Sequence, residues 1–86
     1  MSSEIVWTLS HEASDGTSRG ILGRFSSREA AVEVANAETK EWPFVGIGVL
    51  ECDLGGSPQP LRGRVWEAKQ GGVTQTMMVA PEEVQP

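Results

Sequence analysis

The sequence has little of what many catalytic and metal sites require. It contains one cysteine, Cys52, which excludes an internal disulfide framework and a cysteine-based zinc cluster. It contains one histidine, His11, so any histidine-dependent chemistry must use that residue. A phosphate-binding glycine loop, a paired-histidine metal helix and a nucleophile elbow are all missing. The sequence therefore predicts no catalytic residue, no metal site and no cofactor.

Long apolar runs are also missing. No stretch approaches the roughly 20 apolar residues of a membrane-spanning helix. The first four residues have neither the basic start nor the apolar core of a signal peptide. We therefore expect a cytoplasmic protein with no membrane association. The 86 residues suffice for one domain, which we expect over residues 1–80, with a flexible acidic tail at residues 81–86.

Basic residues are few, and the acids are unevenly distributed. Seven Lys and Arg stand against twelve Asp and Glu, a net charge of −5. Such a balance excludes a general nucleic-acid binder, which needs basic surface to displace phosphate counterions. The charges of residues 1–28 and of residues 54–86 each sum to zero, so the whole excess lies in residues 29–53, the acidic middle segment. Its acids are Glu29, Glu33, Glu38, Glu41, Glu51 and Asp53.

The first half of the chain predicts a β-hairpin followed by a helix. Apolar and polar residues alternate over residues 5–12, turn formers fill residues 13–18, and a second strand is expected over residues 19–25. Ser26-Ser27-Arg28-Glu29 matches a capping box, so we expect a helix to begin at Arg28, in a segment that contains no Gly or Pro up to about Glu41. Glu38 falls in the apolar sector of that helix. We therefore expect the helix to end or bend before Glu38, rather than the side chain to extend from that sector to water.

The second half of the chain predicts three more strands. Residues 45–53 are apolar on both faces, which indicates a central strand. Residues 55–60 form a Gly/Pro loop, and residues 64–69 and 73–80 form a hairpin that ends at Pro81. The order β-β-α-β-β-β is typical of the α+β class, with an antiparallel sheet of about five strands and one helix packed on one face.

Residues 5–12 and 20–31 also resemble a class of small uncharacterised bacterial and phage proteins. In those proteins a strand ends in His-Glu or a similar pair. A G-x-[FY]-S-S-x-E-x-A step, present here at residues 23–31, then enters a helix. The resemblance covers residues 5–40. It implies a β-β-α start and no known activity.

Two functional hypotheses follow. The first is a small acidic, non-catalytic protein-interaction module, an accessory or phage-type regulator or inhibitor that binds a protein partner. We expect Trp66 to be exposed at its surface, because Arg64 and Glu67 flank it. The residues expected to bind the partner are Glu29, Glu33, Glu38, Glu41, Glu51, Asp53 and Trp66.

The alternative is a small enzyme or ligand-binding subunit. In this hypothesis His11 acts as a general base together with Glu51 or Asp53. A homodimer that pairs its exposed sheet edges is compatible with either hypothesis.

Overall fold

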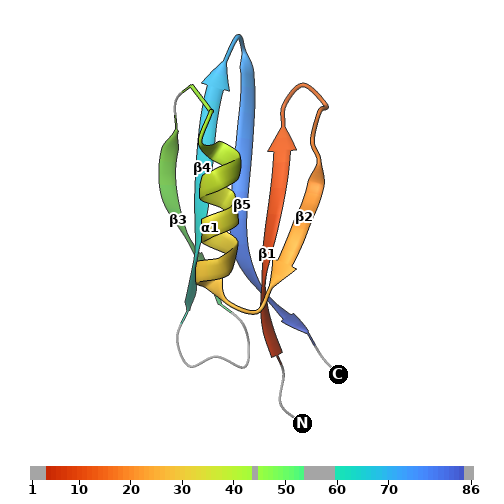
Figure 1. The fold of residues 1–86 in the computed structure, drawn as a ribbon, viewed down its shortest axis with the longest axis vertical. Coiled ribbons are helices and arrows are strands. Elements are labelled where there is room, and N and C mark those ends of the chain that lie inside the picture. The colour runs from red at the N-terminus through yellow and green to blue at the C-terminus, as the bar shows by residue number, and fades with distance from the viewer. Residues whose placement is uncertain (1–3, 44, 54–59, 85–86) are drawn as a thin grey trace.

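The fold is known from a computed structural model that describes residues 4–43, 45–53 and 60–84. Its strands are β1 (Glu4–Ala13), β2 (Gly20–Phe25), β3 (Gly46–Cys52), β4 (Leu61–Gln70) and β5 (Val73–Val84), and its helix is α1 (Arg28–Thr39). The strands form one antiparallel sheet in the order β2-β1-β5-β4-β3, with α1 on one face (Figure 1). The predicted α+β class and element order are confirmed. Within the described ranges, no helix is long and apolar enough to cross a membrane.

The first and last strands form the middle of the sheet. β1 and β5 pair without interruption from Glu4–Val84 to Ala13–Gln75. The β4–β5 hairpin turns at Gly71 and Gly72, whose φ angles of 59° and 79° suit glycine. This arrangement leaves β2 and β3 as the two edges. The prediction that the strand after the helix is central is therefore wrong, because apolar residues on both faces do not specify which strands flank it.

The start of α1 confirms the cap in part. The N-cap residue is Ser27, one position later than the capping box predicts, and its Oγ accepts a hydrogen bond from the Ala30 N–H at 3.2 Å. The helix continues through Glu38, whose carboxylate lies 3.1 Å from the Arg19 guanidinium. The predicted end before Glu38 is wrong, because the side chain reaches an exposed partner beside the sheet.

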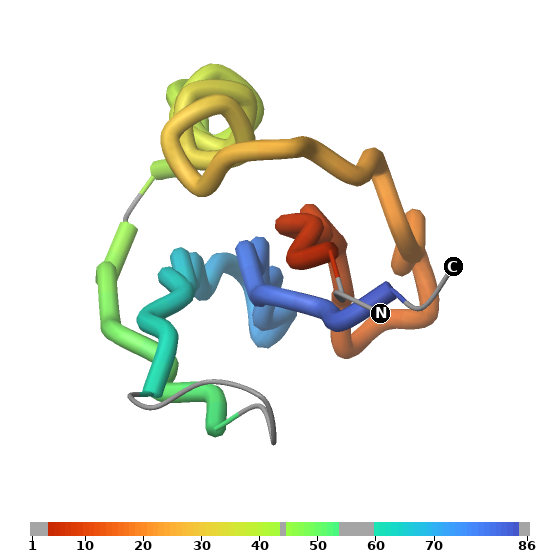
Figure 2. Tube along the Cα trace, turned by 90° about the horizontal axis from the view of Figure 1, so that it is seen from below, coloured from red at the N-terminus to blue at the C-terminus, as the bar shows by residue number. Residues whose placement is uncertain are grey.

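The core lies between α1 and the central strands. Figure 2, a view along the strands, shows α1 on one face of the curved sheet. Its buried residues are Leu9, Ala31, Ala35, Trp66, Met77 and Val79. Alanine on the inner side of α1 lets the helix lie close to the sheet. Trp66 is 1 % exposed, and its Nε1–H donates to Asn36 Oδ1 at 3.2 Å. The expectation of an exposed Trp66 is wrong, because charged neighbours in the sequence do not determine which face of a strand is covered.

The last strand passes through Pro81 and ends at Val84. Pro81 pairs with Trp7 of β1, whereas the pairing of β5 with β4 stops at Val79–Arg64. At Pro81 one side of β5 is therefore a sheet edge, where a residue without an N–H group is tolerated. The predicted strand end at Pro81 is wrong, and so is a flexible tail that starts at residue 81. Residues 85 and 86 lie outside the described ranges.

Candidate functional site

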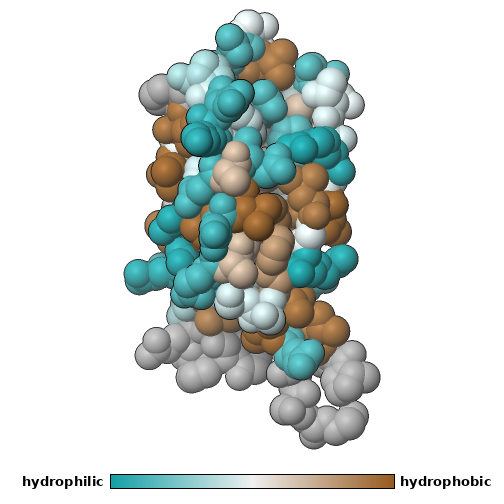
Figure 3. Space-filling model, in the orientation of Figure 1, coloured by the Kyte–Doolittle hydropathy of each residue, from teal (hydrophilic) through white to brown (hydrophobic). Residues whose placement is uncertain are grey.

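Three acids of the middle segment form an exposed acidic helix face, which we define as Glu29, Glu33 and Glu41. Glu29 and Glu33 lie on the side of α1 turned away from the buried Ala31 and Ala35, and Glu41 follows the helix. All three are exposed, and the ion pairs found in the described residues involve none of them. Hydrophilic atoms accordingly cover much of the outer surface of α1 in Figure 3.

The other three acids of the segment lie elsewhere. Glu38 pairs with Arg19, just before β2, at 3.1 Å, and Glu51 of β3 pairs with Arg62 of β4 at 3.7 Å. Both pairs are solvent-exposed, so each contributes at most about 1 kcal/mol to stability. Asp53 is exposed just beyond the end of β3. The six acids are therefore distributed over three places and do not form one cluster.

An apolar patch lies on β3, where the sequence did not predict one. Ile47 and Val49 are 62 % and 68 % exposed, and we call these two residues the β3 patch. They pair with Trp66 and Arg64, so their side chains lie on the face of the sheet that carries α1. In the described structure α1 packs on β1, β2, β4 and β5 but not on β3. Hydrophobic atoms are visible on the flank beside the helix, where β3 runs (Figure 3).

His11 is buried, and both of its ring nitrogens have partners. It is 4 % exposed; Nδ1 accepts a hydrogen bond from the Arg19 N–H at 3.2 Å, and Nε2 lies 3.1 Å from Gln75 Oε1. This arrangement fits the neutral tautomer in which Nε2–H donates to the amide oxygen. The ring also meets Trp42 edge-on, with centroids 6.3 Å apart. His11 therefore holds the chain between β1 and β2 in place.

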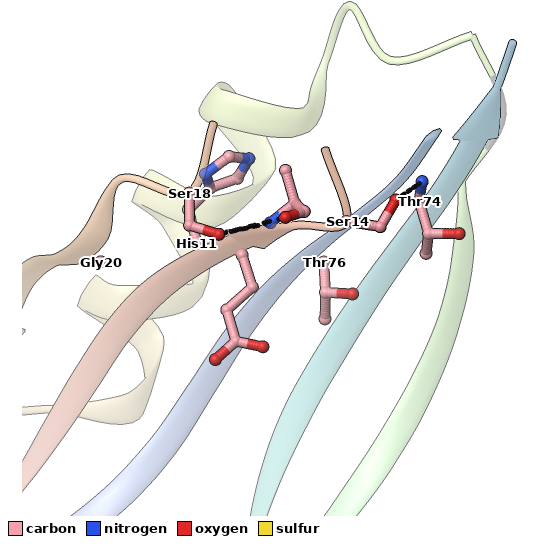
Figure 4. Close-up of a pocket in the computed structure, with 8 residues that line it drawn as sticks. His11, Ser14, Ser18, Gly20, Thr74 and Thr76 are labelled. Atoms are coloured by element: carbon pink, nitrogen blue, oxygen red, sulfur yellow. Dashed lines mark hydrogen bonds between the residues drawn. The ribbon is translucent and has the colours of Figure 1, made fainter. Parts of the chain in front are cut away.

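An open depression of about 370 Å³ lies beside His11 at the end of β1 (Figure 4). Two of its hydroxyl groups are already used: Ser18 Oγ accepts from the Ala13 N–H at 2.8 Å, and Ser14 Oγ accepts from the Thr74 N–H at 2.9 Å. These bonds hold the β1–β2 turn and the start of β5 together. The lining residues are His11, Glu12, Ala13, Ser14, Ser18, Gly20, Thr74 and Thr76.

The structure does not bring His11 together with Glu51 or Asp53. Across the sheet, His11 is in register with Ile47 of β3, three strands away, and Glu51 lies four residues further along β3. Sheet geometry then separates His11 from Glu51 by roughly 20 Å. Within the described residues, no three His, Cys, Asp or Glu side chains could share a metal ion.

Comparison with known proteins adds no relative. No protein-family model matches the chain, and the comparisons with curated proteins and with solved structures find no match either. The resemblance over residues 5–40 thus stays a prediction.

Sequence reasoning missed the β3 patch as a surface feature. One signal for it was present: glycine occupies positions 46 and 48, so one face of this strand has little side chain to pack. Alternating glycine weakens a strand and argues against a tightly packed central position.

Proposed function

We propose that this protein is a small non-catalytic interaction module, an accessory regulator or inhibitor that binds a protein partner. The observation that carries the proposal is the acidic helix face. Glu29 and Glu33 project from the exposed side of α1, Glu41 is exposed just after the helix, and all three take part in none of the ion pairs found in the described residues. Their charge is available to an incoming molecule.

A partner for this surface carries a basic patch. Opposite potentials on two surfaces raise the rate of association and favour the correct partner, and salt weakens that effect.

Charge reversal tests the proposal. Tagged protein would be used to capture partners from a lysate of its own host, once as wild type and once with Glu29→Lys, Glu33→Lys and Glu41→Lys. We expect a stoichiometric protein that the wild type retains, that salt releases and that the triple variant loses. The matched control, Glu4→Lys with Glu12→Lys and Glu83→Lys, makes the same change in net charge elsewhere and should retain that protein. Equal retention by both variants would exclude the acidic helix face as the binding surface.

The alternative, an enzyme or ligand-binding subunit that uses His11 with Glu51 or Asp53, has no support in the geometry. A general base must lie within hydrogen-bond reach of the proton it removes. Both ring nitrogens of His11 are already engaged within the fold, and the two carboxylates are far away.

A further inference from the structure

Among the described residues, no strand pairs with the outer edge of β3. β3 pairs with β4 residue by residue from Gly46 to Cys52 without a bulge. It contains no proline and no basic residue, and its single charged residue, Glu51, stands next to its end. The outer side of an edge strand presents N–H and C=O groups that lack a neighbouring strand, and native proteins normally block such edges with bulges, prolines, lysines or a covering helix. Of these devices, β3 has only one charged side chain, Glu51, next to its end.

The side chains of β3 favour the same conclusion. Ile47 and Val49 lie on the helix side of the sheet beside the buried Trp66, yet more than half of each residue is exposed. A further strand beyond β3 would cover them with its own side chains, and it would extend the apolar layer that begins at Trp66.

From these observations we infer that a second copy of this chain pairs with β3, antiparallel and about a two-fold axis at Gly48. In this register Ile47 of each copy stands opposite Val49 of the other, on the helix side. Directly opposed β-branched residues stabilise a sheet. On the other face, Leu50 of each copy stands opposite Gly46 of the other, so a large side chain meets an open position. The two-fold axis repeats each favourable pair, and the assembly closes as a dimer.

The charges are compatible with this register. Glu51 of each copy stands opposite Val45 of the other, and within each copy Arg62 lies 3.7 Å from Glu51. The two Glu51 residues are six strand positions apart, about 20 Å. This separation exceeds twice the Debye length of about 8 Å at physiological ionic strength, so their repulsion is small.

Pairing in this register places both α1 helices on the same face of a continuous sheet. The contact is confined to two seven-residue strands, which is small for a protein interface, so we expect a reversible dimer with micromolar or weaker affinity. The inference rests on the β3 edge and not on the proposed function, and it is tested on the purified chain without any partner.

Sedimentation over a range of concentrations tests the association. We expect the weight-average mass of the wild type to rise from 9.2 kDa towards twice that value. Val49→Lys, at an exposed position, should keep the fold by circular dichroism and stay monomeric. Ile21→Lys, a matched change on the β2 edge at a residue 53 % exposed, should keep the wild-type curve. A wild type that stays monomeric at every concentration would overturn the inference. This includes the case in which β3 binds only a different protein. A dimer that survives Val49→Lys would overturn it too.

A disulfide tests the register. Directly opposed residues of antiparallel strands have Cα atoms about 4.5–5.5 Å apart, within the range that a disulfide spans. A side chain at Gly48 would meet no atom within 4 Å, so Gly48→Cys is accommodated. In a Cys52→Ser background, oxidised Gly48→Cys should form a covalent dimer, and Ile21→Cys should not. Cross-linking through Ile21→Cys alone would show pairing at β2 and overturn the inference.

Discussion

The two edges of this sheet differ in how well they are protected. β2 is six residues long and contacts α1, which follows it in the chain. A bulge interrupts its pairing with β1, and the extra residue, Leu22, packs against the core. Arg24 of β2 lies 3.5 Å from Glu82. β3 is seven residues long and regular, lies outside the cover of α1, and exposes Ile47 and Val49.

The difference shows that burial and protection follow the position of α1. The helix lies over the central strands of the sheet and does not pack on β3 (Figure 1). A bulge and a charged side chain are devices by which native proteins keep an edge from pairing. β2 has both, the bulge at Leu22 and the charge of Arg24, whereas β3 has no bulge and one charge, Glu51, next to its end. The molecule therefore has one closed edge and one edge that is available for association.

The largest expected effect comes from Gly63→Ala, which disturbs the β3 side of the molecule. A Cβ at Gly63 would overlap the backbone carbonyl of Val79, and backbone atoms cannot move aside cheaply. We expect the free energy of unfolding to fall by about 3 kcal/mol, at the upper end of the cost of overpacking. Urea denaturation measures the change. Gly48→Ala, where an added Cβ meets no atom within 4 Å, is the control and should stay close to wild type. Equal stability of the two variants would mean that β4 and β5 can separate without cost.

The next largest effect concerns His11, which holds the chain between β1 and β2 in place beside the closed edge. His11→Leu removes the acceptor of the Arg19 N–H and the partner of Gln75, so it breaks two part-buried hydrogen bonds of the buried His11 side chain. We expect a loss of about 2 kcal/mol in the free energy of unfolding. Amide exchange should show faster opening of β2 than of β3. Glu12→Ala, at the exposed neighbouring residue, is the control, and we expect little change in its free energy of unfolding. A stable His11→Leu protein with unaltered exchange would contradict the anchoring role.

A third and smaller effect concerns the start of α1, the helix that follows β2. Ser27→Ala removes the oxygen that accepts from the Ala30 N–H, and the loss of such a cap costs about 1 kcal/mol. Ser26→Ala should have less effect, because Ser27 is the N-cap residue. Thermal denaturation of the two variants decides between them. If Ser26→Ala were the more harmful, the cap would lie where the capping box predicts it.

The comparison of the edges also shows what the sequence could predict. The α+β class, the element order and the helix start depend on local patterns: alternation over residues 5–12, turn formers, and serines before Arg28. The position of β3 depends on which strands flank it. β5 comes last in the chain yet lies between β1 and β4. Local apolar pattern carries no information about that insertion.

Contacts between residues far apart in the sequence also explain why the predictions for Trp66 and Glu38 were wrong. Trp66 is buried because Met77, eleven residues later, pairs with it under the helix. Glu38 stays in the helix because Arg19, nineteen residues earlier, lies beside it. The acidic helix face was predictable, since helical periodicity alone places Glu29 and Glu33 away from the apolar side.

The smallest expected effect concerns the pKa of Glu82, which lies in β5 on the β2 side of the sheet. Hydrogen bonding by the Thr8 hydroxyl, at 2.8 Å, and then the charge of Arg24 lower the pKa of Glu82 below its ordinary value of 4.5. A carboxyl whose pKa is lowered by folding stabilises the folded state above its ordinary pKa. That contribution is lost as the pH falls through the folded-state pKa. The group is exposed, so solvent screening keeps the contribution small.

Thr8→Val tests this link, because it removes the donor and keeps the β-branched shape. We expect the pKa of Glu82 to rise towards 4.5, as measured by a carboxyl carbon NMR titration. Any stability difference from wild type should be present above that pH and vanish in more acidic solution. Thr76→Val, further along the same face of β5, should leave the titration unchanged. An unaltered pKa in Thr8→Val would assign the shift to Arg24 alone. The protection of the β2 side would then depend on the Arg24–Glu82 ion pair, which salt weakens, and not on the hydroxyl contact between β1 and β5.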